Sequence, residues 1–281
     1  MKFVGIFIFV ALVIFVSARN HLDNEVSEVK NLTDDDIKVV CYFTNWSWYR
    51  QGIGKYSPED IDSHLCTHIV YGFASLDANT LKIKTYDSWV DIDNHFYQRV
   101  TAYHQKGIKI LIAIGGWNDS TEKYSRLLTN PSARHKFIES VIDFIGKYNF
   151  QGLDLDLEYP GCWQGLCRAS SARDRQGFSQ FIQELSETFK PHNYLLSAAV
   201  SPGKQIIDIA YDVPILSQYL DWIALMAYDY HGSWDRSTGH NAPLYYYPGD
   251  KYDYFNVDYT VNYWIKKGAQ SDKLVLGVPA Y

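Results

Sequence analysis

Short apolar segments alternate with amphipathic stretches over most of the sequence. Seven of these segments have the length of a strand and are rich in Val, Ile, Leu and Tyr; they span residues 39–43, 67–73, 108–114, 152–157, 194–200, 222–227 and 274–278. Most of them lack the apolar–polar alternation of a half-buried strand. Such segments are typical of strands that are covered on both faces, as they are in parallel sheets.

Helical patterns lie between these segments. Asn130 followed by Pro131 is a favourable N-cap and first-turn pair, and apolar residues continue at helical spacing as far as residue 148. A second apolar helix face runs over residues 178–189, and Gly107 predicts the end of a helix before the third strand. The sequence therefore predicts helices that connect successive strands.

The repeated order of strand and helix predicts an α/β fold of the TIM-type (β/α)8 barrel class. An open, doubly wound sheet is the alternative, and it is disfavoured because no glycine-rich phosphate-binding pattern follows the first strand. A barrel of this class closes with eight strands, and the pattern supplies seven. We therefore expect an incomplete barrel.

The first 18 residues have the features of a secretory signal peptide. Lys2 precedes an apolar run over residues 3–16, and Ser17 and Ala18 are small residues suited to cleavage. The run is shorter than the roughly 20 residues of a membrane-spanning helix, and an uncleaved N-terminal anchor is the alternative. The sequence then predicts a polar segment over residues 19–35, a folded domain over residues 36–281 and a secreted, extracellular protein.

Cysteines of a secreted protein fold in an oxidising compartment, where they pair. The sequence has four: Cys162 and Cys167 lie in one loop, and Cys41 and Cys66 begin two consecutive apolar segments. Three pairings are possible. Proximity favours disulfides between Cys41 and Cys66 and between Cys162 and Cys167.

Three N-glycosylation sequons occur, at Asn31, Asn45 and Asn118. Asn31 lies in the polar segment over residues 19–35, where an acceptor is accessible. We therefore expect a glycan at Asn31.

Aromatic residues make up 16% of the sequence, including 23 Tyr and 8 Trp. Aromatic rings in excess of what a core needs often contact flat apolar surfaces, and sugar rings are one such surface. The formal net charge of −6 disfavours nucleic acid as a partner, because nucleic acids are bound by basic surfaces. After the N-terminal run no apolar stretch reaches membrane length. We expect a monomer with neither nucleic-acid nor membrane partners.

The strongest chemical signal is the segment GLDLDLEYP at residues 152–160. Alternate residues of a strand share a face, so Asp154, Asp156 and Glu158 point one way and the leucines between them point the other. Carboxylates stacked in a poorly solvated place repel one another, which raises at least one pKa and favours a general acid near neutral pH. A divalent-metal site is the competing interpretation, although Tyr and Trp nearby are poor ligands. We expect no metal and no cofactor.

Six segments resemble motifs of the chitinases of glycoside hydrolase family 18, in the same order along the chain. They are CYFTNW at 41–46, YGFA at 71–74, GGW at 115–117, GLDLDLEYP at 152–160, LSAAV at 196–200 and MAYDYHG at 226–232. The resemblance covers roughly residue 36 to the last residue, and the loop 162–167 is most similar to arthropod members. It implies an enzyme that hydrolyses the β-1,4 linkages between the N-acetylglucosamine units of chitin, with chitin and chitooligosaccharides as partners.

The resemblance also implies roles for individual residues. Glu158 would donate a proton to the glycosidic oxygen, Asp156 would hold the N-acetyl group of the substrate, and Asp154 would lie beneath Asp156. Tyr228 would orient the acetamido oxygen, which is the nucleophile in this family, and the anomeric configuration would be retained. The expected substrate-binding residues are Tyr42, Trp46, Phe73, Gly116, Trp117, Tyr159, Met226 and Asp229.

Several aromatic residues have more than one interpretation. Core packing remains an alternative for Tyr42 and Phe73, which lie within predicted strands. Trp89 and Trp264 are predicted to pack in the core or against helices. The tyrosines at 245–247 either line the outer cleft or cover it.

The sequence departs from the family pattern at three places. An acid is usual where Gln151 stands, and this change is expected to have a structural cost only. A Trp is common where Leu157 stands, and this change is expected to be tolerated. The family continues past the seventh strand with a small inserted domain and an eighth strand, and neither follows in this sequence. The alternatives are therefore a chitinase, a chitin-binding lectin-like protein, or an inactive truncated product of a chitinase gene. The family's lectins usually lose the acid that Glu158 supplies, so its presence favours the enzyme.

Overall fold

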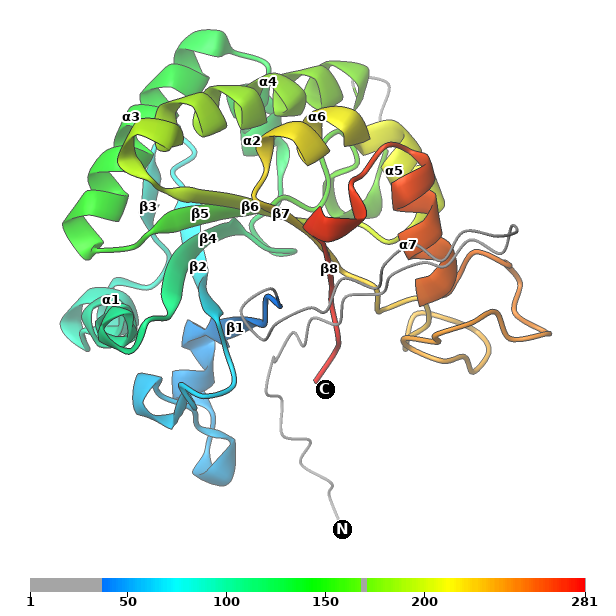
Figure 1. Ribbon diagram of the computed structural model, residues 1–281, viewed down its shortest axis with the longest axis horizontal. Coiled ribbons are helices and arrows are strands. Elements are labelled where there is room, and N and C mark those ends of the chain that lie inside the picture. The colour runs from blue at the N-terminus through cyan, green and yellow to red at the C-terminus, as the bar shows by residue number, and fades with distance from the viewer. Residues whose placement is uncertain (1–36, 168–170, 281) are drawn as a thin grey trace, which may run out of the picture.

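The structure of the protein, a computed structural model, describes residues 37–167 and 171–280. A central sheet contains seven parallel strands in the order β1-β2-β4-β5-β6-β7-β8. Their bounds are β1 Val40–Thr44, β2 His68–Leu76, β4 Lys109–Gly115, β5 Gly152–Asp156, β6 Leu195–Val200, β7 Trp222–Leu225 and β8 Leu274–Leu276. The sheet curls (Figure 1), so the prediction of an incomplete TIM-type barrel is confirmed.

One further strand, β3 (Ile83–Thr85), is absent from the sequence-based prediction. It pairs antiparallel with the carboxyl end of β2, where Leu76 lies opposite Ile83. A strand of three residues is too short to show a hydrophobic period, which explains why the pattern missed it. The next residue, Tyr86, lines the cleft described below, so this missed strand shapes the site.

Helices surround the outer face of the curled sheet (Figure 1). Their bounds are α1 Phe96–Thr101, α2 Glu122–Leu128, α3 Pro131–Tyr148, α4 Ser171–Phe189, α5 Lys204–Ala210, α6 Val213–Tyr219 and α7 Val257–Lys266. The two helices predicted most clearly from the sequence, α3 and α4, are the longest of these. The alternation of strand and helix that the pattern predicts is therefore confirmed over the described residues.

Local signals in the sequence set the ends of these helices. The Asn130 side chain accepts a hydrogen bond of 3.2 Å from the backbone N–H of Ala133 and caps α3, with Pro131 at its first position. Gly107 adopts a positive φ of 83° at the end of a 3-10 helix, Ala102–Lys106, just before β4. Both signals were visible in the sequence.

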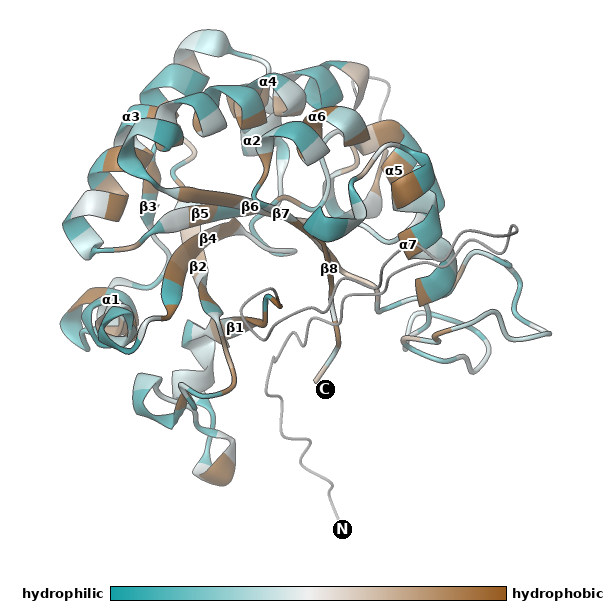
Figure 2. Cartoon of the chain, in the orientation of Figure 1, coloured by the Kyte–Doolittle hydropathy of each residue, from teal (hydrophilic) through white to brown (hydrophobic). Residues whose placement is uncertain are grey.

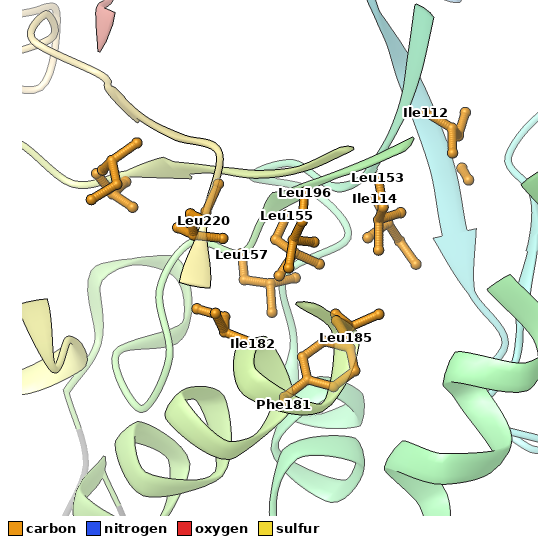
Figure 3. Packing of buried hydrophobic residues seen from close by; sticks show 14 of the residues in the cluster. Ile112, Ile114, Leu153, Leu155, Leu157, Phe181, Ile182, Leu185, Leu196 and Leu220 are labelled. Carbon is orange, nitrogen blue, oxygen red and sulfur yellow. The ribbon is translucent and has the colours of Figure 1, made fainter. Parts of the chain in front are cut away.

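The main core lies between the sheet and its outer helices. Figure 3 shows Leu153, Leu155 and Leu157 directed toward α4, where Phe181 and Leu185 face them. All five side chains are at most 1% exposed. Complete burial of a side chain of this kind contributes about 1.5–3 kcal/mol, so this interface holds β5 firmly in register.

A smaller apolar cluster fills the inner face of the curled sheet. It consists of Val40, Val70, Leu111, Ala113, Trp222, Ala224 and Val275, one or two residues from each of several strands. Figure 2 accordingly shows strands such as β4 and β6 as largely hydrophobic and the helices as mixed. Because both faces of the sheet are apolar, the strands read as continuous apolar segments rather than as alternating ones.

The prediction that Trp89 packs in the core is wrong, because its side chain is 57% exposed. Trp89 begins a helical turn, Trp89–Asp93, in which Val90 and Asp91 are the buried residues. The Asp91 carboxylate accepts hydrogen bonds from the hydroxyl of Tyr71 and the amide of Asn45, which turns this side of the segment inward and leaves Trp89 outside. Trp264, by contrast, is fully buried as predicted.

Both disulfides favoured by proximity are present, Cys41–Cys66 and Cys162–Cys167. Asn45 is 2% exposed and hydrogen-bonded to Asp91, so its sequon lies in the core. The signal peptide over residues 1–18, the polar segment over residues 19–35 and the sequon at Asn31 lie outside the described residues. Among the residues that the structure describes, no helix is both long and apolar enough to span a membrane.

Candidate active site

The carboxyl end of β5 carries the three acids that the sequence singled out. Asp154 and Asp156 lie on β5 opposite Ala113 and Gly115 of β4, and Glu158 follows two residues later. The leucines between them pack toward the helices (Figure 3), so the acids face the inside of the curled sheet. One strand therefore divides its side chains between the core and the site.

Asp154 is the deepest of the three acids and is fully buried. Its carboxylate accepts a hydrogen bond of 2.6 Å from the Ser197 hydroxyl and one of 2.9 Å from the Tyr42 hydroxyl. Burial raises the pKa of Asp154 to about 6, although these two hydrogen bonds act to lower it. The carboxyl group of Asp154 is thus half ionised at about pH 6.

Asp156 lies between the other two acids and has one buried oxygen, Oδ1, without a hydrogen-bond partner among the described residues. Burial raises the pKa of Asp156 well above its ordinary value, and the charges of Glu158 and Asp154 raise it further. A buried polar atom without a partner is costly unless a ligand satisfies it. Asp156 is therefore ready to bind a polar group of a ligand.

Glu158 is the acid nearest the mouth of the cleft. Burial raises its pKa to about 7; a hydrogen bond with the Tyr159 side chain lowers the pKa, and the charge of Asp229 raises it. A carboxyl group with a pKa near 7 is half protonated at neutral pH and can both donate and accept a proton. This property suits a general acid that later acts as a general base.

A loop after β4 holds the backbone at the end of β5. The N–H of Gly116 donates a hydrogen bond of 2.8 Å to the carbonyl of Asp156. Gly115 has a φ of 113°, and a Cβ atom there would lie 2.1 Å from that same carbonyl oxygen. Only glycine fits this approach, and the turn leaves the Trp117 side chain 49% exposed at the rim of the cleft.

The opposite wall follows β7. Two backbone hydrogen bonds of 2.8 Å follow one another there. The Ala227 N–H donates to the Leu225 carbonyl, and the Tyr228 N–H donates to the Met226 carbonyl. Asp229 adopts a positive φ of 56°, and its carboxylate accepts a hydrogen bond from the Asn241 amide. The wall therefore presents a sharply turned segment rather than a continued strand.

These walls enclose a cavity of about 610 Å3, within the usual range for small-molecule sites. Most of the sequence-predicted residues line it: Tyr42, Trp46, Phe73, Gly116, Trp117, Asp156, Glu158, Met226, Tyr228 and Asp229. The rings of Trp46 and Phe73 stack with an interplanar angle of 13° and form an apolar part of the lining. Asp154 lies behind this lining, and Tyr159 packs against the hydrophobic core.

Other predicted features lie outside the cavity. The tyrosines at 245–247 are exposed and do not contribute to its lining. Over the described residues, no group of three or more His, Cys, Asp or Glu side chains is arranged to hold a metal ion.

Comparison with known proteins agrees with this geometry. The family model for glycosyl hydrolases family 18 matches residues 38–281. The chain belongs to glycosyl hydrolase family 18. Over 249 residues it is 56% identical to probable chitinase 10 of Drosophila melanogaster, covering 88% of this chain and 11% of that protein.

Solved structures of family 18 show the same fold. A mutant of catalytic domain 2 of the Ostrinia furnacalis group II chitinase, in complex with penta-N-acetylchitooctaose, is 54% identical with a TM-score of 0.85. That match covers 86% of this chain and 63% of the other chain. Human YKL-39, described as a pseudo-chitinase that retains chitooligosaccharide binding, is 38% identical with a TM-score of 0.75, covering 84% and 65% of the two chains. This chain thus spans less than two thirds of each of these relatives.

Several residues in and around the cavity escaped the sequence analysis. Thr44, Tyr86, Asn118 and Asp119 line the cavity, and Ser197 binds Asp154 from the neighbouring strand. Ser197 lies within the segment LSAAV, so the family motif included this residue but did not indicate that it binds Asp154. Tyr86 follows the unpredicted strand β3, and no pattern in the sequence places it at the site.

Proposed function

We propose that the chain carries the site of a secreted chitinase, which hydrolyses the β-1,4 linkages of chitin with retention of configuration. The observation that carries this proposal is the pair formed by Glu158 and Asp156. Glu158 lines the cavity with a pKa raised to about 7, and the neighbouring Asp156 has a buried oxygen without a protein partner among the described residues. A proton donor beside an unsatisfied acceptor suits a substrate with an acetamido group.

In the first step, protonated Glu158 gives its proton to the glycosidic oxygen, and the bond from that oxygen to the anomeric carbon breaks. The carbonyl oxygen of the substrate's own acetamido group forms a bond to the anomeric carbon, giving an oxazolinium ion. Asp156 accepts a hydrogen bond from the acetamido N–H and so holds the acetamido group against the anomeric carbon. Tyr228, on the opposite wall, orients the acetamido oxygen.

In the second step, a water molecule attacks the anomeric carbon from the face that the leaving group vacated. Glu158, now ionised, takes a proton from this water, the acetamido group is restored, and two inversions give retention. Asp154 supports Asp156 from below, where Tyr42 and Ser197 hold it.

The aromatic lining supports a sugar as the substrate. Trp46 and Phe73 stack on one side of the cavity, and Trp117 is half exposed at its rim. Flat aromatic faces bind the apolar faces of sugar rings while hydroxyl and acetamido groups reach the polar residues. Chitin and chitooligosaccharides are therefore the proposed ligands.

We also propose that the protein passes through the secretory pathway and carries a glycan at Asn31. The two disulfides, Cys41–Cys66 and Cys162–Cys167, support this proposal because such bonds form in oxidising compartments.

A binding protein without hydrolysis is the second candidate. The similarity to YKL-39, a pseudo-chitinase that binds chitooligosaccharides, supports it. Glu158 separates the two candidates, because it supplies the proton that hydrolysis needs and binding does not.

The test compares wild type with Glu158→Gln on a soluble chitooligosaccharide. Loss of the transferable proton is expected to lower kcat by about 10²–10⁴-fold, while tryptophan fluorescence still reports binding. Glu187→Gln, the same change at an exposed position on α4, is the matched control. Full activity of Glu158→Gln would disprove the assignment, and binding without turnover in wild type would favour the second candidate.

Cellooligosaccharides test the substrate-assisted step in the same assay. They lack the acetamido group that acts as the nucleophile, so wild type is expected to leave them uncleaved. Turnover of cellooligosaccharides at a rate comparable to chitooligosaccharides would contradict this mechanism.

A further inference from the structure

The loop between β4 and α2 contacts the end of β5 at three points. The Gly116 N–H donates to the Asp156 carbonyl at 2.8 Å, and the Ser120 hydroxyl donates to the same carbonyl at 3.4 Å. In the opposite direction, the Glu158 N–H donates a hydrogen bond of 2.9 Å to the Ser120 hydroxyl oxygen. Ser120 is fully buried and thus joins the backbones of two acids of the site.

We propose that Ser120 is a positioning residue for Glu158; this inference rests on the proposed function, in which Glu158 is the proton donor. Glu158 lies beyond the last residue of β5, so its N–H is outside the ladder that fixes the strand. The Ser120 hydroxyl supplies the acceptor that a neighbouring strand would otherwise supply. It sets the direction in which the Glu158 side chain leaves the backbone.

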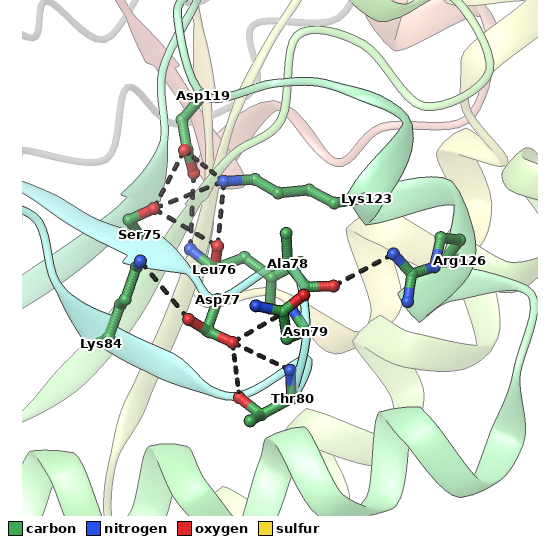
Figure 4. Close-up of polar contacts among 10 residues, drawn as sticks. All are labelled: Ser75, Leu76, Asp77, Ala78, Asn79, Thr80, Lys84, Asp119, Lys123 and Arg126. Carbon is green, nitrogen blue, oxygen red and sulfur yellow. Dashed lines mark hydrogen bonds and ion pairs between the residues drawn. The ribbon is translucent and has the colours of Figure 1, made fainter.

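Ser120 can act in this way because its own loop is anchored. Figure 4 shows that Ser75 and Lys123 converge on the carboxylate of Asp119, the residue before Ser120. Tyr124 donates a further hydrogen bond of 2.6 Å to Asp119, and Lys123 donates one of 3.0 Å to the Leu76 carbonyl. The loop is thereby fixed to the end of β2.

The anchoring group is well shielded from water. The side chains of Asp119 and Lys123 are only 10% and 14% exposed, so solvent screens this ion pair weakly. The position of Glu158 therefore depends on a line of contacts that runs from β2 through Asp119 and Ser120 to the end of β5.

A role in folding alone would give a different result from a role in positioning. Loss of a buried hydroxyl lowers the stability of any protein, whichever site it serves. Loss of positioning lowers kcat without weakening substrate binding, since small displacements of a reacting group slow the chemical step. It also changes the environment of the Glu158 carboxyl and therefore the pH at which the rate falls.

The experiment compares wild type, Ser120→Ala, Ser120→Thr and the matched control Ser217→Ala. Ser217 is also a buried serine, and its hydroxyl accepts a hydrogen bond of 2.9 Å from the Gln270 N–H. Neither residue lines the cleft. All chains are produced in the bacterial periplasm, which adds no N-glycan, because Ser120→Ala also removes the Asn118 sequon.

Ser120→Ala is expected to lower kcat on a chitooligosaccharide by about 10- to 100-fold with KM within about twofold. Its rate is expected to fall at a lower pH than that of wild type, because a carboxyl freed to move toward water loses part of the burial that raises its pKa. Ser120→Thr keeps the hydroxyl and is expected to restore most of kcat. Ser217→Ala is expected to lose stability with kcat unchanged.

The inference is overturned if Ser120→Ala has wild-type kcat and pH profile, or if Ser217→Ala loses kcat to the same degree. If Ser120→Ala does not fold, Ser120→Cys replaces it, because a thiol fills the space but accepts hydrogen bonds weakly; the same fall in kcat is expected, and a wild-type kcat overturns the inference. Glu158→Gln separates the two proposals. An active Glu158→Gln variant disproves the function, whereas an inactive one beside a fully active Ser120→Ala variant disproves only the role of Ser120.

Discussion

The hydroxyl of Tyr42 donates a hydrogen bond of 2.9 Å to Asp154 across the inside of the curled sheet. Tyr42 lies on β1 and Asp154 on β5, so this bond joins two strands that are not neighbours in the sheet. This strand tyrosine lines the cavity and supports the acids, in addition to its packing against the inner apolar cluster.

Tyr42→Phe is expected to lower the free energy of unfolding by about 1–3 kcal/mol at pH 8 and by less at pH 5. The hydrogen bond favours the ionised form of Asp154, whose pKa is about 6, so its loss costs most where that form predominates. Urea unfolding at the two pH values measures the difference. An equal loss at both values would show that the bond does not depend on the charge of Asp154.

The rate of hydrolysis is expected to fall as the pH rises through about 7. Glu158 must be protonated to donate, and its pKa of about 7 means that the protonated fraction drops by about tenfold for each further pH unit. A profile of kcat/KM from pH 4 to 9 on a soluble chitooligosaccharide measures this limb. A rate that continued to rise above pH 8 would exclude Glu158 as the acid.

The free energy of unfolding is expected to fall between about pH 4.5 and pH 7. Folding raises the pKa of Glu158 from 4.5 to about 7, so the folded state binds more protons than the unfolded chain within this window. The contribution is fully present below the window and lost above it. Glu158→Gln removes this proton, and the pH dependence of its urea unfolding should be flatter than that of wild type; an unchanged slope would contradict the raised pKa.

Gly115→Ala is expected to destabilise the fold by about 2–4 kcal/mol, because the new Cβ would lie 2.1 Å from the Asp156 carbonyl oxygen at a φ of 113°. Gly146→Ala is the matched control. Gly146 lies on an exposed face of α3, and no atom lies within 4 Å of the position that its new methyl group would take, so this change is expected to stabilise by about 0.5–1 kcal/mol. Thermal unfolding of both variants is the measurement. Destabilisation of Gly115→Ala alone supports the clash with the Asp156 carbonyl oxygen, whereas equal destabilisation of both variants would indicate a general cost of replacing glycine.

The sequence predicted those parts of the structure that burial dictates. Strands covered on both faces must be apolar throughout, so all seven parallel strands were visible, and the alternation of acids and leucines placed Asp154, Asp156 and Glu158 on one side. Ser120 was not predicted, because it binds backbone groups of Asp156 and Glu158 that carry no side-chain signature. Asp119 was not predicted, because its contacts with Ser75 and Tyr124 depend on how the chain folds rather than on a spacing visible in the sequence. Trp89 was misplaced because a large apolar residue was assumed to be buried, whereas polar contacts to Asp91 set the direction of its turn.

The two faces of β5 serve different layers, because its leucines pack in the core and its acids face the cleft. Substitution of a single leucine or acid affects one layer, the core or the site. Insertion or deletion of one residue within Gly152–Asp156 would instead exchange the layers, turning carboxylates toward α4 and leucines into the cleft. A substitution in this strand should therefore impair either the core or the site, whereas a change in its length should impair both at once.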